Sequence, residues 1–270
     1  MPTTACAPPR AGCRGQTGWA RAADEFALTT VLLFGVVTMV RWLRDPGSPV
    51  YVADLDAALV LIGVLSGTFV TALMFSSPGK RSGAHMNPAV TVALWLMDAL
   101  PGRMVPLYVV AQLAGSAAGT ALGRLVWGPA VALPSVAIAA IKPSPTWQAS
   151  SVFLAEVAAM FVLIVVAGFL MAHPRRIRLL PYAIGLAVGL VIALLGARSG
   201  GSINPARQFG PAMLSGQTTD LCVYLTAPVL GAVLGAAVHH LITTRFNAYR
   251  NHPEGVPSCA PNHSVSQRFW

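Results

Sequence analysis

The tripeptide Asn-Pro-Ala occurs twice in this chain of 270 residues, at 87–89 and at 204–206. Each copy follows a long apolar run, and 204 − 87 = 117 positions separate the two asparagines. Proline fits the first turn of a helix, where its missing N–H would be unpaired anyway, and asparagine is a favoured N-cap before it. The pattern therefore predicts an internal duplication in which each copy begins a helix.

The two helices that follow these tripeptides are too short to cross a bilayer. Residues 88–97 and 205–214 are apolar or nearly so, whereas a membrane-spanning helix needs ~20 residues. Backbone that breaks off at membrane depth is tolerated only where protein buries it or where it lines a water-filled cavity. Half-helices in corresponding halves of a repeat point to a shared site at the midplane, so we expect a pathway that passes Asn87 and Asn204.

The composition places the rest of the chain in a membrane. Apolar residues make up 55% of it and charged residues only 10%, which is too apolar for an ordinary soluble domain. Runs without charge predict six spans, at about residues 26–40, 57–75, 104–123, 151–172, 179–197 and 221–242. Each half then holds three spans, so the second half inserts upside down and the half-helices meet N-terminus to N-terminus. We expect an all-α membrane protein with six transmembrane helices and two re-entrant half-helices in an inverted repeat.

The flanking segments, residues 1–22 and 246–270, are predicted to be disordered tails around a channel domain of residues 23–245, whose repeats cover about 23–128 and 149–245. The net charge is +9, but the basic residues form no patch interleaved with aromatic residues of the kind that binds nucleic acid. If both termini are cytoplasmic, twelve basic residues lie inside, as the positive-inside rule favours. Five lie outside, namely Arg41, Arg44, Arg124, Lys142 and Arg198.

The two boxes, SGAHMNPAVT and GGSINPARQFGP, together with the frame of apolar spans, resemble the aquaporin and glycerol-facilitator family, also called the major intrinsic protein family. The resemblance implies a homotetrameric channel of the plasma membrane that passively conducts water and small uncharged solutes and excludes ions and protons. It implies no enzymatic step, no cofactor and no metal site. The pore residues that it implies are Asn87, Pro88, Ala89, Asn204, Pro205 and Ala206.

The resemblance also assigns supporting roles to two glutamates and a histidine. Glu25 and Glu156 are expected to accept hydrogen bonds from the backbone of the re-entrant loops, a role that we favour over a proton relay. His85 matches the histidine of the family's first box and is expected to be structural. Gln112, a lone polar residue in the third span, is expected to make a hydrogen bond between helices.

Four positions of the family's selectivity filter are carried over by their spacing from the boxes. They are Gly67, Ile192, Gly201 and Arg207; a one-residue insertion within residues 76–81 would move the first of them to Ser66. Water-selective members have an aromatic residue and a histidine at the first two positions, whereas this combination resembles that of the nodulin-type plant channels. A bacterial-type member with such a wide filter is expected to pass glycerol, urea or undissociated metalloid acids.

Two other functions remain open from the sequence. A water-selective aquaporin has the same boxes, and an ion-coupled secondary transporter also uses inverted repeats and broken helices. Apart from Glu25, Glu156 and Arg207, the charged residue types Asp, Glu, Lys and Arg avoid the predicted spans, which argues against ion coupling. A membrane-embedded enzyme is disfavoured because no nucleophile with a nearby base is predicted at membrane depth.

Overall fold

The computed structural model describes residues 17–250, with side chains as far as Thr243. Six long helices dominate this part of the chain, and each is long and apolar enough to cross a membrane. They are α1 (Gly18–Arg44), α2 (Leu55–Phe75), α5 (Met104–Trp127), α6 (Ala149–Met171), α7 (Leu180–Leu195) and α9 (Leu221–Arg250). The span of α7 includes the 3₁₀ turn before it and runs from Ile177 to Leu195. The shorter elements are α3 (Ser77–Ser82), α4 (Pro88–Leu96), α8 (Pro205–Ser215) and the 3₁₀ turns η1 (Gly128–Ala132), η2 (Ala137–Ala139) and η3 (Ile177–Leu179). The predicted fold of six spans and two half-helices is confirmed.

The ends of the first and last spans differ from the prediction. α1 begins at Gly18, inside the segment predicted as a tail, because the Thr17 hydroxyl caps the backbone N–H of Ala20. α9 continues to Arg250, beyond the predicted boundary at residue 245. Runs without charge mark only the apolar middle of a span, whereas its end turns can carry charged side chains that reach toward water. The rest of the predicted tails, residues 1–16 and 251–270, lies outside the described residues.

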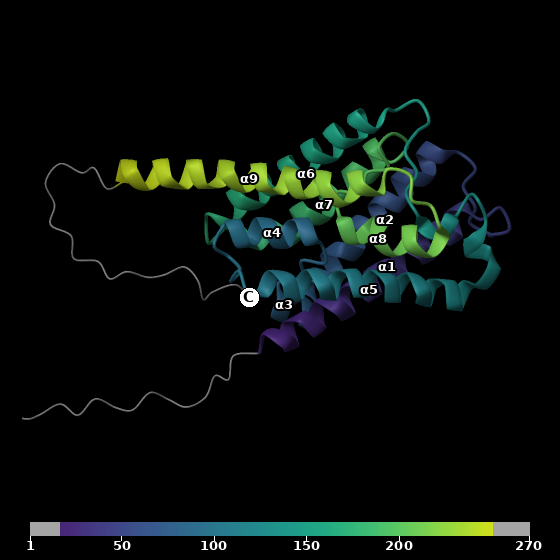
Figure 1. Ribbon diagram of the computed structural model, residues 1–270, viewed down its shortest axis with the longest axis horizontal. Coiled ribbons are helices and arrows are strands. Elements are labelled where there is room, and N and C mark those ends of the chain that lie inside the picture. The colour runs from purple at the N-terminus through teal and green to yellow at the C-terminus, as the bar shows by residue number, and fades with distance from the viewer. Residues whose placement is uncertain (1–16, 251–270) are drawn as a thin grey trace, which may run out of the picture.

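The long helices run side by side, and the two half-helices α4 and α8 lie in line between them, one toward each end of the bundle (Figure 1). The described N-terminal and C-terminal ends of the chain lie at the same end, which we call the terminal end. The connections 45–54 and 128–148 lie at the opposite end, which we call the loop end.

Glycines allow the helices to pack closely in three pairs. In the α1–α5 pair, a Cβ atom built on Gly119 would lie 2.2 Å from the carbonyl oxygen of Thr30. In the corresponding α6–α9 pair, a Cβ on Gly231 would lie 2.3 Å from the carbonyl oxygen of Val157. Small residues therefore bring these helices into backbone contact, as is common in membranes.

The third pair, α2 and α7, joins the two halves of the repeat. A Cβ atom on Gly63 would lie 2.5 Å from the carbonyl oxygen of Gly189, and one on Gly67 would lie 2.3 Å from that of Gly185. These four glycines form two small-xxx-small motifs that pack against each other. The crossing fixes the distance between two helices that both line the central cavity described below.

Candidate pore

Asn87 and Asn204 begin the two half-helices in the same way. Both asparagines have extended backbone, with φ of −156° and −150°, and each side-chain Oδ1 accepts a hydrogen bond of 2.9 Å from the N–H two residues later. The following prolines occupy the first turn, where no N–H is needed. The helix starts predicted from the two tripeptides are therefore present.

The two asparagines also hold the half-helices together. Asn87 Nδ2 donates to the carbonyl of Ile203 at 2.9 Å, and Asn204 Nδ2 donates to the carbonyl of Met86 at 2.9 Å. The two helix N-termini thus meet in the middle of the bundle. An amide nitrogen has two N–H groups, so each asparagine has a second donor beyond the one that makes this cross-link.

The loops before the two boxes repeat the same unusual backbone 117 positions apart. Gly83 and Gly200 have φ of +97° and +93°, and Met86 and Ile203 have φ of +47° and +43°. Positive φ is strained for side chains such as methionine and isoleucine, at a cost of ~1–3 kcal/mol each. Contacts from the surrounding helices must therefore stabilise these loops.

Two buried glutamates provide those contacts. Glu25 accepts hydrogen bonds from the backbone N–H of His85 at 2.9 Å and of Met86 at 2.7 Å, and from the Ser82 hydroxyl at 2.7 Å. Glu156 accepts from Ser202 N–H at 3.1 Å, from Ile203 N–H at 2.6 Å and from the Ser199 hydroxyl at 2.8 Å. Each carboxylate satisfies three buried donors of one loop, which is the structural role that the family resemblance implies.

His85 and Gln112 join the network around the first loop. The Nδ1 atom of His85 lies 3.0 Å from the hydroxyl oxygen of Thr91, and its ring packs against Tyr108 with the ring centroids 5.0 Å apart. Gln112 donates to Glu25 Oε2 at 2.8 Å and to Thr91 Oγ1 at 3.0 Å. The predicted hydrogen bond between helices is present, and it links α5 to both α1 and α4.

Several residues of this support were not identified from the sequence. Tyr108 donates its O–H to the carbonyl of Ser82 at 2.7 Å, and Tyr224 donates to the carbonyl of Ser199 at 2.5 Å. The two serines are 117 positions apart, like the asparagines, and the two tyrosines are 116 apart. A search at the repeat's spacing of 117 would have found the two serines, whereas the two tyrosines lie one position off that spacing.

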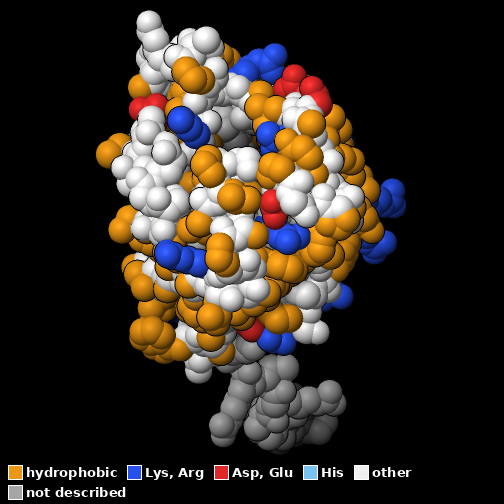
Figure 2. Space-filling view, turned by 90° about the vertical axis from the view of Figure 1, so that its right-hand side faces the viewer, with side chains coloured by type: hydrophobic (Ala, Val, Ile, Leu, Met, Phe, Trp, Pro, Cys, Tyr) orange, Lys and Arg blue, Asp and Glu red, His pale blue; other side chains and the backbone are white. Residues whose placement is uncertain are grey.

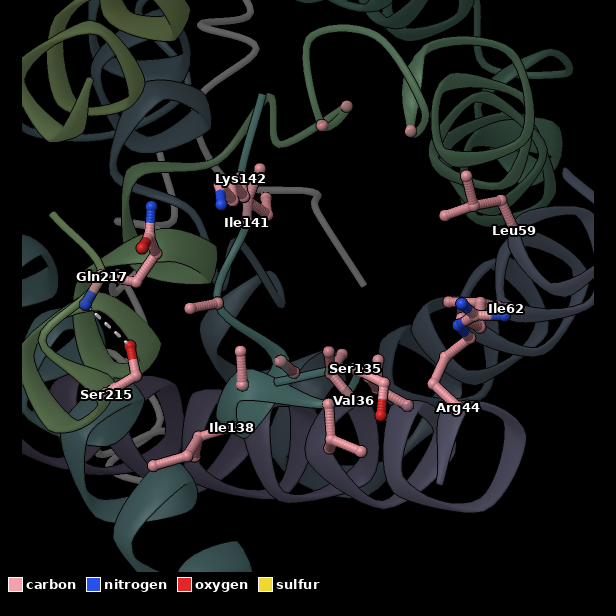
Figure 3. A pocket seen from close by; sticks show the side chains of 18 of the residues that line it. Val36, Arg44, Leu59, Ile62, Ser135, Ile138, Ile141, Lys142, Ser215 and Gln217 are labelled. Carbon is pink, nitrogen blue, oxygen red and sulfur yellow. Dashed lines mark hydrogen bonds between the residues drawn. The ribbon is translucent and has the colours of Figure 1, made fainter. Parts of the chain in front are cut away.

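A cavity of about 920 Å³ opens at the loop end, and we call it the vestibule (Figure 3). It is lined by α1, α2, α5, α7, α8, the segment 132–145 and the loop 196–201, and Figure 2 shows the hollowed surface at this end of the molecule. Residues from both the second box and the surrounding helices line it, including Ser66, Ile192, Gly201 and Arg207.

The structure distinguishes between Gly67 and Ser66, the two residues predicted as alternatives for the first filter position. Gly67 does not line the vestibule, because its α-carbon faces the backbone of Gly185 in the crossing of α2 and α7. The neighbouring Ser66 lines the cavity instead. Successive residues of a helix point about 100° apart, so a shift of one position moves a side chain from the helix contact to the cavity.

Arg207 reaches across the vestibule to the segment that follows η1. Its Nη1 donates to the carbonyl of Ala139 at 2.8 Å. That carbonyl belongs to three successive left-handed residues, Ala137, Ile138 and Ala139, with φ of 46°, 52° and 61°. Gln208 holds the same segment, because its side chain exchanges two hydrogen bonds of 2.8 and 3.0 Å with the backbone of Ile141.

A smaller cavity of about 100 Å³ lies on the other side of the boxes, toward the terminal end. Its lining includes His85, Gly83 and Arg81. Arg81 donates two hydrogen bonds to the Asp24 carboxylate, at 3.0 and 2.6 Å, and this contact raises the pKa of the arginine. The smaller cavity is thus lined by residues just before the first box, and the vestibule by residues on both sides of Asn204 in the chain.

An inverted repeat of membrane spans whose half-helices meet between two cavities defines a membrane channel. The chain belongs to the major intrinsic protein family, whose model matches residues 14–239. It is 32% identical over 223 residues to the probable aquaporin NIP7-1 of Arabidopsis thaliana, which covers 82% of this chain and 76% of that protein. It is 37% identical over 182 residues to aquaporin NIP3-1 of Oryza sativa subsp. japonica, covering 67% of this chain and 56% of that protein.

A solved structure supports the fold independently. The X-ray structure of the aquaglyceroporin from Plasmodium falciparum is similar with a TM-score of 0.74 at 22% identity, covering 86% of this chain and 100% of that one. The family predicted from the two boxes is therefore confirmed, and so is the aquaporin-like fold. The chain is an integral, multi-pass membrane protein and a channel for water and small solutes.

Proposed function

We propose that this channel passes uncharged polar solutes larger than water, such as glycerol, urea or undissociated metalloid acids, in addition to water. The observation that carries the proposal is the identity of the side chains beside Arg207 in the vestibule. Ser66, Ile192 and Gly201 line the same cavity, and none of them is aromatic. Neither an aromatic ring nor a histidine narrows the cavity at these positions.

The chemistry of these four residues suits a solute with several hydroxyl groups. A guanidinium has five N–H donors, and one nitrogen of Arg207 is bonded to Ala139. The remaining donors and the Ser66 hydroxyl can bind solute oxygens, while Ile192 supplies an apolar wall for the carbon backbone of a polyol. We propose that Ser66, Ile192, Gly201 and Arg207 together form the selectivity filter.

The two half-helix N-termini supply the charge selectivity. Each carries roughly half a positive charge, and both point to the same place between Asn87 and Asn204. This field repels cations, and Arg207 adds a full charge on the loop side. An ion that enters a narrow passage also loses its hydrating waters, and no other ligands take their place. Neutral molecules are therefore favoured.

The relatives of this chain support the proposal. The two plant proteins are named as aquaporins, and the similar structure is that of an aquaglyceroporin. We further propose a homotetramer in the plasma membrane with no enzymatic activity. The loop end then faces outward and both termini lie in the cytoplasm, an orientation that the bias of basic residues supports.

Stopped-flow light scattering on proteoliposomes tests the proposal, with gradients of water, glycerol, urea and boric acid applied in turn. We expect flux of water and of at least one of the three solutes well above that of protein-free vesicles, rising linearly with the gradient. Water flux alone would favour a water-selective aquaporin. Saturable uptake that requires a proton or sodium gradient would favour a secondary transporter.

A further inference from the structure

The vestibule contains an unusual balance of charge. Four basic side chains line it, from α1, α5, the segment 132–145 and α8, and no aspartate or glutamate of the described residues does. The four are Arg44, Arg124, Lys142 and Arg207. Arg44 and Lys142 lie on opposite sides of the opening in Figure 3. The cavity therefore holds four positive charges without a carboxylate among them.

Carboxylates are present at the same end of the molecule, but they lie elsewhere. Asp45 is buried, lies 3.7 Å from Arg41 and accepts the N–H of Gly47 at 2.8 Å. Asp54 caps α2 by accepting the N–H of Ala57 at 2.7 Å. Asp56 and Asp220 also fall outside the lining of the vestibule. The positive charge is thus concentrated in the cavity and not spread over the surface.

The four charges are not neutralised by other contacts. Arg44 and Arg207 bond to backbone carbonyls, at 2.6 Å for Val52 and 2.8 Å for Ala139, and these leave a net charge on each guanidinium. Lys142 and Arg124 are exposed, and within residues 17–243 neither makes a hydrogen bond or an ion pair. The positive end of the helix dipole of α8, at its N-terminus, adds to this positive potential.

From this arrangement we propose that the vestibule is a binding site for small oxyanions free in solution, and that an anion held there obstructs the entry of neutral solutes. At about 920 Å³ the cavity has room for a hydrated divalent oxyanion, since one water occupies ~30 Å³ in the liquid. To pass Ile192 the anion would have to lose its hydrating waters beside an apolar side chain, which costs free energy. The anion therefore stays in the vestibule.

Sulfate is the probe for the test, and the full-length protein in proteoliposomes is the sample. Glycerol uptake is measured with increasing sodium sulfate on both sides of the membrane, against sodium chloride at equal ionic strength and osmolality. We expect sulfate to lower uptake at concentrations where chloride does not. The effect should weaken as the ionic strength is raised, because exposed charges are screened.

Variants of Lys142 separate electrostatic binding from a change of shape. We expect the half-inhibitory sulfate concentration to rise about threefold in Lys142→Gln and about tenfold in Lys142→Glu, since each step removes one unit of charge. Arg198→Gln and Arg198→Glu are charge-matched controls, because Arg198 lies at the same end but does not line the vestibule. Equal sulfate sensitivity of the parent and both Lys142 variants, or an equal effect of the Arg198 variants, would overturn the proposal.

A second measurement does not depend on solute flux. Thermal unfolding of the purified protein in detergent should shift upward with sulfate in the parent and less in Lys142→Glu, because a ligand that binds the folded state stabilises it. The inhibition assay rests on the proposed function, whereas this shift does not. A sulfate-dependent shift in a protein without flux of glycerol, urea or boric acid would refute only the proposed solute range, and no shift with intact flux would refute only the anion site.

A lipid phosphate could supply the same chemistry, and the lipid composition distinguishes it from a free anion. If headgroups occupied the vestibule, vesicles containing anionic lipid would show reduced uptake without any sulfate. We expect the sulfate-free uptake to be the same with and without anionic lipid, because the vestibule is lined by the pore helices around its aqueous opening. A reduction by anionic lipid alone would overturn the assignment to a free oxyanion.

Discussion

Replacing Gly67 by alanine tests the helix crossing that fixes the geometry of the vestibule. The added Cβ atom would lie 2.3 Å from the carbonyl oxygen of Gly185, 3.1 Å from its carbonyl carbon and 3.4 Å from the nitrogen of Gly189. All three atoms belong to the backbone of α7, so no change of side-chain rotamer can relieve the contact. The two helices must move apart to accept even a methyl group.

The size of the effect follows from that distance. Non-bonded heavy atoms are optimally ~3.5–4.0 Å apart, so α2 and α7 must separate by on the order of 1 Å at this point. Overpacking of this kind costs ~1–3 kcal/mol, which corresponds to a decrease of roughly 2–12 °C in the unfolding temperature. Thermal unfolding of the purified protein in detergent measures it through tryptophan fluorescence.

Ser66→Ala is the matched control on the preceding residue of the same helix. It removes a hydroxyl whose one hydrogen bond in the described structure is a weak one of 3.7 Å to the sulfur of Met39. We expect its unfolding temperature to stay within about 2 °C of the parent, since weak contacts contribute little. If Gly67→Ala unfolds with the parent while Ser66→Ala is destabilised, the placement of these two residues is wrong.

Three further predictions concern the loops and the filter. Glu156→Ala leaves three buried donors of the second loop without an acceptor and should lower the free energy of unfolding by ~3–9 kcal/mol. Glu156→Gln keeps one acceptor oxygen, so equal unfolding temperatures for the two variants would contradict the assigned role. Tyr224→Phe removes the donor to the Ser199 carbonyl and should lower the free energy of unfolding by ~1 kcal/mol, measured by the same unfolding assay. An unchanged unfolding temperature would mean that this hydrogen bond does not stabilise the fold. Ser66→Phe combined with Ile192→His should lower glycerol and boric acid flux more than water flux in stopped-flow measurements, and an equal loss of both would show that the filter is misplaced.

The features that the sequence predicted are those with local causes. An asparagine followed by proline caps a helix through atoms two residues apart, so both half-helices could be identified without knowledge of the packing. The six spans follow from the length that a bilayer demands of an apolar run. The inverted arrangement follows from the odd number of spans in each half.

The residues of the proposed filter were harder to predict because their placement depends on where helices cross. Gly67 and Ser66 are neighbours in the sequence, and both are small, so their spacing from Asn87 could not decide which one faces the cavity. Residues 77–82 form the short helix α3 between them and the first box. The packing of α2 against the glycines of α7 determines which of these two residues faces the cavity.

The sequence by itself thus determined the class of fold, the position of the two half-helices and the family, because helix caps, apolar spans and the repeated tripeptide can each be recognised in a short stretch of the chain. Tertiary structure alone decided that Ser66 faces the vestibule, that Ala139 receives Arg207 and that four basic side chains share one cavity. The physical reason is that these relations join segments far apart in the chain, whose mutual orientation is set by helix packing and by hydrogen bonds that exist only in the folded molecule.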